Sequence, residues 1–128
     1  MAELMLFSET GMFHSGVRCT WGSVVEWYGF LPERHRSPAG RGKVDRSDRS
    51  ALINHSARFR IDDLVLRKAV DATAADYATK TYVVTVVDCV SFTADVARKA
   101  GLKVPLVNFT PYGFLKTVES LNPSAVIR

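Results

Sequence analysis

The first third of the chain alternates short apolar runs with turn-forming residues, a pattern that predicts strands. Residues 4–7, 14–19 and 24–30 are rich in β-branched and aromatic side chains, and turn signals around Gly11 and Gly22 separate them. We therefore expect three strands, the last two joined as a hairpin.

A strand and a helix are predicted next. Residues 57–61 alternate apolar and polar positions, which suits a half-buried strand. Asp62 or Asp63 then offers an N-cap for an Ala-rich helix that runs to about Thr79. Residues 82–87, with the sequence Tyr-Val-Val-Thr-Val-Val, form the run with the strongest strand preference in the chain.

Two further helices complete the pattern. Asp88 is a plausible N-cap for a helix that ends at Ala100, before the stop signal Gly101. Cys89 begins an apolar row at helical spacing, so we expect its side chain to face inward from the first turn. A last helix is expected over residues 112–121. The predicted fold class is α+β, with antiparallel strands and helices packed against them.

Composition indicates one globular domain. The chain has 128 residues, 47% of them hydrophobic and 23% charged, so residues 1–128 are expected to form a single core. The net charge of +4 is concentrated in residues 33–50, a Gly-, Pro- and Ser-containing segment that we interpret as a flexible basic loop. Because this loop is not a basic face and lacks interleaved aromatic residues, we expect no nucleic-acid partner.

The sequence also bears on compartment and cofactors. It contains no run approaching the roughly 20 apolar residues of a membrane-spanning helix and no pattern of a secretory signal at its start. We expect synthesis in the cytoplasm, no membrane span and two reduced cysteines. No His or Cys pair lies at a metal-ligand spacing, so we expect neither a metal nor a cofactor.

One thiol is placed to act as a nucleophile. Cys89 lies in the first turn of a helix, where unpaired amides and the helix dipole favour the thiolate. Cys19, at the end of a strand, has no such support and is interpreted as a packing residue. Of the histidines that could serve as base, His35 lies in the basic loop and His55 has no evident reason to face the helix. His14 opens a strand of the sheet and is the chosen partner.

Spacing alone leaves a second interpretation open. A buried cysteine at an apolar helix position is more often a small hydrophobe than a nucleophile. A single histidine near a strand start is also more often structural than catalytic. Catalysis and packing therefore both fit the pattern.

Two segments resemble a known group of enzymes. Residues 82–115 contain Tyr-x5-Asp-Cys-Val-Ser-Phe-Thr-Ala-Asp-Val-Ala-x3-Gly-Leu-x-Val-Pro and then Pro-Tyr-Gly-Phe-Leu. This segment resembles the nucleophile strand and helix of circularly permuted papain-like hydrolases. Residues 13–17 (Phe-His-Ser-Gly-Val) resemble the Gly-His-x-x-Val strand of the permuted NlpC-type families, and residues 27–32 resemble the Tyr-Gly-Phe-x-Pro that follows it. PPPDE-type isopeptidases and lecithin retinol acyltransferase-like proteins are relatives of this group.

The resemblance implies a permuted papain-like fold and acyl transfer. His14 would take the thiol proton and Cys89 would attack an amide or ester carbonyl. The group that orients the imidazole depends on the hairpin register. A three-residue turn would place Tyr28 opposite His14 with Glu26 one step along, whereas a two-residue turn would bring Trp27 there. Glu26 is our choice for the third catalytic residue.

The chain departs from the family pattern at two positions. Asp88 stands where Asn is common, and its charge would oppose ionisation of the thiol unless it caps the helix. Phe13 stands where Gly is usual, and its side chain would narrow or redirect the cleft.

The expected function is peptide amidase or endopeptidase activity on peptidoglycan. In this interpretation the protein is a bacterial toxin effector or lysis enzyme, delivered by a secretion system to the periplasm of a target cell and countered by an immunity protein. Tyr28, Arg34 and Arg36 would bind the peptide substrate. The alternatives are a non-catalytic binding module of the same fold, a lipid acyltransferase, or an isopeptidase acting on ubiquitin-like tags.

Overall fold

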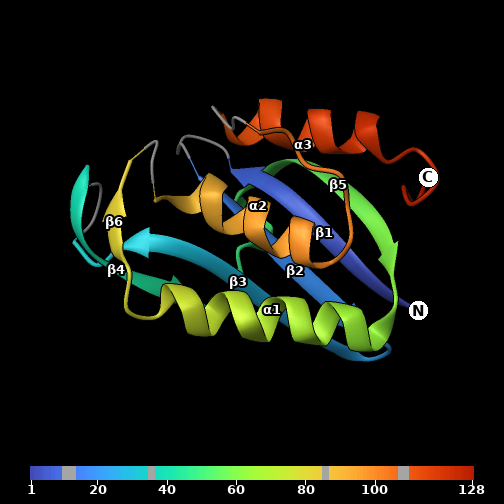
Figure 1. Cartoon of the computed structure of the whole chain (residues 1–128), viewed down its shortest axis with the longest axis horizontal. Helices are drawn as coiled ribbons and strands as arrows, with labels where there is room; N and C mark the ends of the chain where they lie inside the picture. Colours follow the sequence, from blue (N-terminus) through green and yellow to red (C-terminus); the bar gives the residue numbers. More distant parts are fainter. Residues whose placement is uncertain (10–13, 35–36, 85–86, 107–109) are drawn as a thin grey trace.

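The computed structural model describes residues 1–9, 14–34, 37–84, 87–106 and 110–128. They form an α+β structure in which six antiparallel strands make one sheet with the order β5-β1-β2-β3-β4-β6, and three α-helices accompany it (Figure 1). The expected fold class is confirmed at this level. The elements are β1 Ala2–Glu9, β2 Ser15–Trp21, β3 Val24–Pro32, β4 Ala39–Asp45, η1 Ser50–Leu52, β5 Ile53–Ile61, α1 Asp63–Tyr77, β6 Thr81–Val83, α2 Cys89–Lys99 and α3 Pro111–Leu121.

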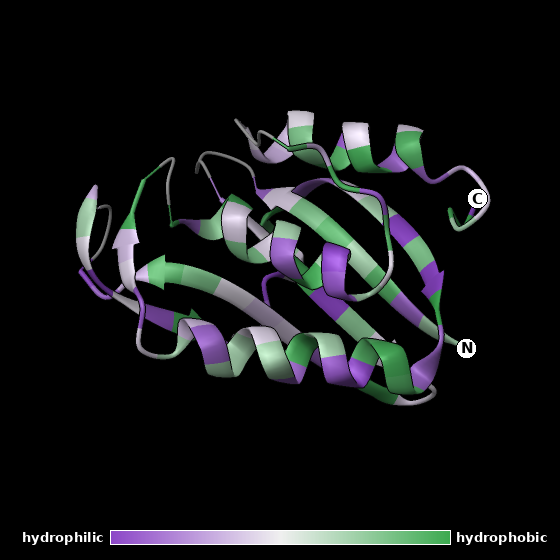
Figure 2. Cartoon of the chain, viewed as in Figure 1, coloured by the Kyte–Doolittle hydropathy of each residue, from purple (hydrophilic) through white to green (hydrophobic). Residues whose placement is uncertain are grey.

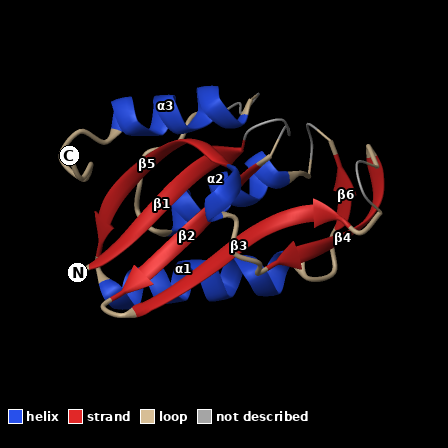
Figure 3. Cartoon of the chain, turned by 180° about the vertical axis from the view of Figure 1, so that it is seen from behind, coloured by secondary structure: helices blue, strands red, loops and turns tan. Residues whose placement is uncertain are grey.

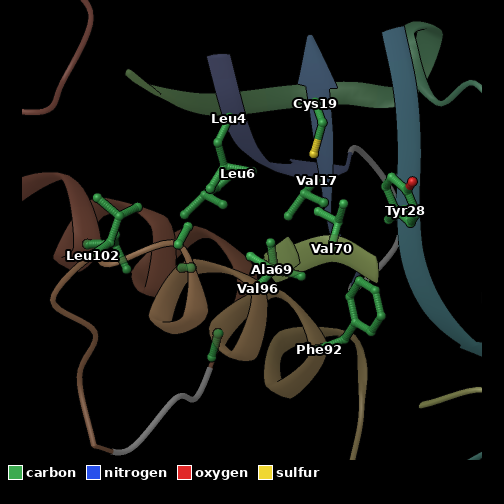
Figure 4. Close-up of a cluster of buried hydrophobic side chains, with 14 of the residues drawn as sticks. Leu4, Leu6, Val17, Cys19, Tyr28, Ala69, Val70, Phe92, Val96 and Leu102 are labelled. Carbon is green, nitrogen blue, oxygen red and sulfur yellow. The ribbon is translucent and has the colours of Figure 1, made fainter. Parts of the chain in front are cut away.

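All three helices cover the same face of the sheet, which we call the helical face; the other is the back face (Figures 1 and 3). Strand side chains alternate between the two faces. Leu4 and Leu6 of β1 and Val17 of β2 therefore point towards Val96 of α2 and form the main core with it (Figure 4).

A second, smaller cluster lies on the back face. It contains Met5, Phe7 and Trp27, and the rings of Phe7 and Trp27 meet edge to face at 5.6 Å between centroids. The connection between β4 and β5 begins beside β3, where Arg46 Nε donates to the Trp27 carbonyl at 2.8 Å. A Cβ on Gly16 would lie 2.6 Å from the Phe7 ring, so this strand position requires glycine.

The β2–β3 hairpin turns later than either register considered from the sequence. Its turn is Gly22–Ser23, flanked by the pair Trp21↔Val24, and Gly22 has a positive φ of 58°. β2 continues past Cys19 because the Trp21 indole donates to the Asp63 carbonyl at 3.2 Å, at the start of α1. The expected pairing of His14 with Tyr28 or Trp27 is therefore wrong.

Residues 33–50, expected to be a flexible loop, contain β4. This strand pairs with β3 on one side and with β6 on the other, as in Phe30↔Val44 and Gly40↔Tyr82. The Phe30 ring lies directly over Gly42, where a Cβ would collide with it. The glycines that indicated a loop therefore allow an aromatic ring to pack on a strand.

The strand expected over residues 82–87 is shorter than predicted. β6 ends at Val83, which forms a pair of backbone hydrogen bonds with Val87 at 2.9 and 2.8 Å. Residues 85 and 86 lie outside the described part of the chain. Val87 lies two residues before α2 begins at Cys89.

The predicted N-cap of α1 is confirmed, because the Asp62 side chain accepts from the amides of Leu64 and Val65. α3 begins at Pro111, one residue before the expected start. α1 ends at Tyr77, two residues before the expected end. α1 carries both polar and apolar residues (Figure 2). Its buried residues recur every three or four positions, as expected for a helix with one buried side. In the described residues, none of the helices has the length and apolar character needed to span a membrane.

Candidate functional site

Cys89 is the first residue of α2, and its side chain is buried, as predicted. The residue is 2% exposed. The Asp88 side chain accepts hydrogen bonds from the amides of Val90 and Ser91, and the Asp88 amide donates to Ser91 Oγ at 2.8 Å. The predicted N-cap is thus confirmed and is part of a reciprocal capping box.

Backbone amides surround the sulfur of Cys89. The amides of Ser15, Val90 and Cys89 itself donate towards it, and each favours the thiolate. Burial outweighs them and, with the nearby Asp88 charge, raises the pKa of the thiol to about 12. In this conformation Cys89 is therefore a protonated thiol at neutral pH.

The first turn of α2 is anchored to the start of β2. Ser15 Oγ donates to Thr93 Oγ1 at 3.1 Å, and Thr93 Oγ1 donates to the Cys89 carbonyl at 2.9 Å. Ser15 therefore points to the helical face, and the Cys89 sulfur lies beside the backbone that joins Ser15 to His14.

The imidazole of His14 lies on the back face. A Cβ on Gly29, which would point to that face, would be 3.3 Å from His14 Nε2. The Phe7 ring of the back-face cluster lies edge-on to the imidazole at 6.5 Å between centroids. The structure thus brings Cys89 to the main chain next to His14, but the sulfur and the imidazole extend to opposite faces of the sheet.

His14 lies beside a buried ion pair. Its Nε2 is 3.7 Å from Oε2 of Glu9, whose side chain is fully buried. Arg49 donates to both carboxylate oxygens of Glu9 at 2.7 Å, from Nε and Nη2, and its Nη1 donates to Asp45 Oδ2 at 3.5 Å. We call Glu9, His14, Asp45 and Arg49 the back-face network.

Burial sets the protonation of His14. Desolvation lowers the pKa of its imidazole to about 4, although the Glu9 charge acts in the opposite direction and Arg49 adds to the lowering. His14 is therefore neutral at pH 7, as a general base must be.

Glu26 and Tyr28 belong to a different cluster. Tyr28 Oη donates to Glu26 Oε1 at 2.7 Å, and Arg67 lies 2.9 Å from the same oxygen. The hydrogen bond from Tyr28, followed by the contacts with Arg67, lowers the pKa of Glu26. Glu26 pairs with Cys19, about 16 Å along β2 from His14, so the structure does not bring the expected third residue to the imidazole.

The expected substrate-binding residues are separated. Tyr28 is buried beneath the Arg46 guanidinium, which lies 4.0 Å from the centroid of its ring. Arg34 is exposed and lines an open cavity of about 470 Å³ at the β3–β4 connection. The other residues lining it are Glu33, Ser37, Ala39, Gly40 and Arg41. Arg36, His35 and Phe13 lie outside the described residues.

Two titratable side chains that make contacts in the fold were not predicted from the sequence to be functional. His55 pairs with Ser8, faces the helical side and meets the Tyr112 ring of α3 at 4.3 Å between centroids. Its position two residues before the buried Ala57 was an available signal, because alternate strand residues share a face. The other is Glu9, two residues after Phe7 at the end of an apolar strand.

Cys19 is a free, fully buried thiol, and burial raises its pKa to about 12, which agrees with a packing role. Across the described ranges, no group of three His, Cys, Asp or Glu side chains is arranged to hold a metal ion.

Comparisons of the chain with known protein families, curated proteins and solved structures find no match.

Proposed function

We propose that the protein is a cysteine hydrolase of the permuted papain-like type, with Cys89 as its nucleophile. The observation that carries the proposal is the set of three amides directed at the Cys89 sulfur at the start of α2. The same donors that stabilise a thiolate are suited to stabilise the oxyanion of a tetrahedral intermediate. His14 precedes one of these donors, Ser15, in the chain.

In the proposed mechanism His14 is the base. Because its imidazole lies on the back face, the side chain must turn towards α2 before it can accept the thiol proton. The thiolate then attacks an amide carbonyl, and the imidazolium gives its proton to the leaving amine. Water, deprotonated by His14, hydrolyses the thioester and restores the thiol.

For the substrate we propose the stem peptides of peptidoglycan. Their carboxylates would interact favourably with Arg34 and Arg41, which border the cavity at the β3–β4 connection. Delivery of the protein to the cell wall of a bacterial target, and inhibition by an immunity protein, belong to the same proposal.

Digestion of purified peptidoglycan tests this function. We expect the wild type to release new amino groups, Cys89→Ala to release none, and Cys19→Ala, the matched control, to retain activity. Chromatography of the released fragments would identify the bond. Equal release by wild type and Cys89→Ala, or no release by either, would contradict the proposal.

A non-catalytic binding module is the second candidate. It is favoured by the burial of Cys89 and by the direction of the His14 imidazole, away from the sulfur. If the protein is a binding module, we expect no variant to digest peptidoglycan. Pull-down with insoluble peptidoglycan should then retain the wild type and Cys89→Ala equally.

A further inference from the structure

We infer that Glu9, held by Arg49, is the positioning residue for His14 and keeps its imidazole on the back face in the resting molecule. The inference rests on the proposed function, because it concerns the base of that reaction. It gives His14 two positions, a resting one beside Glu9 and an active one beside Cys89.

The Glu9 carboxylate is fixed in place. Its side chain is fully buried, and two charge-assisted hydrogen bonds of 2.7 Å from Arg49 leave it little freedom. Its Oε2 still has a lone pair for the imidazole, whose Nε2 is 3.7 Å away. A shift of less than 1 Å from that separation would make a direct hydrogen bond.

The back face also has a space that fits the His14 imidazole. Gly29 leaves the space that the imidazole occupies, since its Cβ would crowd Nε2 at 3.3 Å. The Phe7 ring borders the same space edge-on. Both features belong to β1 and β3, the strands that carry Glu9 and Gly29, and neither involves α2.

This arrangement separates the base from the nucleophile. While His14 remains beside Glu9, it cannot take the proton of Cys89, so the thiol stays protonated and unreactive. Weakening the resting position must therefore increase the fraction of molecules in which His14 faces α2. Glu26 has no such role, because it pairs with Cys19 further along the hairpin.

Alkylation of Cys89 by iodoacetamide, followed by mass spectrometry between pH 6 and 9, tests the inference. We expect Glu9→Gln to label Cys89 several-fold faster than wild type at pH 7, and the gain to disappear when His14→Gln is added. Glu26→Gln is the matched carboxylate control and should label like wild type. Unchanged or slower labelling, or a gain that persists without His14, would overturn the inference.

A second variant covers the case in which Glu9→Gln does not fold. Gly29→Ala crowds the imidazole and leaves the Glu9–Arg49 pair intact, so we expect the same His14-dependent gain. Labelling of Cys19 in the same sample is an internal control. A parallel rise at Cys19 would show general loosening of the fold and would contradict a specific role for Glu9.

The resting position is also observable without enzyme activity. In 15N-histidine NMR spectra, Glu9→Gln should shift the ring nitrogens of His14, and Glu26→Gln should not. If Glu9→Gln shifts the His14 signals but peptidoglycan digestion does not depend on Cys89, the proposed hydrolase function is wrong and the contact between Glu9 and His14 is supported. Digestion that depends on Cys89, with no shift and no labelling gain, would refute the positioning role alone.

Discussion

At the scale of single residues, burial governs the chemistry more than charge does. The amides around the Cys89 sulfur and the Glu9 carboxylate beside His14 each favour the charged form of their neighbour. Desolvation is nevertheless the largest influence on both side chains, because each is almost fully buried. Both groups are consequently neutral in this conformation, and any reaction must begin with a movement that relieves the burial.

Burial of neutral His14 predicts a loss of stability in mild acid. The imidazole has a pKa near 6.5 in the unfolded chain and about 4 in the folded protein, so between these values the unfolded state binds the extra proton. The free energy of unfolding should fall by about 3 kcal/mol as the pH drops through this window. Urea unfolding at pH 7.5, 6 and 4.5 should show this slope in wild type.

The variant His14→Gln, which keeps a polar side chain that does not titrate, is the control for that measurement. It removes the titrating group, so the difference in stability between variant and wild type should narrow as the pH falls. Parallel pH profiles for the two proteins would rule out burial of a neutral imidazole.

At the scale of elements, the start of α2 combines two effects of one side chain. Asp88 stabilises the helix by capping it, and its charge simultaneously opposes ionisation of Cys89. The cap can be kept and the charge removed, since Asn is as good an N-cap as Asp.

Substitution of Asp88 should separate these effects. We expect Asp88→Ala to lower the free energy of unfolding by about 1–2 kcal/mol through loss of the cap, and Asp88→Asn to stay close to wild type. Both variants should lower the pKa of Cys89. Urea unfolding and the pH profile of Cys89 alkylation measure the two effects, and an Asn variant as unstable as the Ala variant would show that the charge, not the cap, stabilises α2.

At the scale of the whole molecule, the two ends of the sheet differ in how many backbone hydrogen bonds hold their strands. β1 lies between β5 and β2 with long registers on both sides, and the helices cover it. β6 lies at the opposite edge and pairs with β4 over three residues only. The end of the sheet that includes β6 is thus held by far fewer backbone hydrogen bonds.

Hydrogen exchange should follow this gradient. We expect the amides of β1 and β2 to exchange with the free energy of global unfolding, and those of β6 and the neighbouring part of β4 to exchange through local opening at much lower cost. Exchange monitored by mass spectrometry on peptides from each strand measures this. Equal protection of β6 and β1 would mean that the whole sheet opens as one unit.

Local pattern was enough to predict several elements of the protein. The capped starts of α1 and α2 and the inward side chain of Cys89 depend on residues within about one helical turn of each other, so they are visible in the sequence. The α+β class with antiparallel strands likewise follows from short runs of alternating and helical periodicity.

The hairpin register, β4 and the direction of His14 were decided only by tertiary structure. The hairpin turns at Gly22–Ser23 because Trp21 packs at the start of α1, and β4 forms because Gly42 accepts the Phe30 ring. His14 faces Glu9 because Gly29 has no side chain and leaves room for the imidazole on the back face. Each outcome depends on contacts between residues distant in the chain, which composition and periodicity within a short window do not encode.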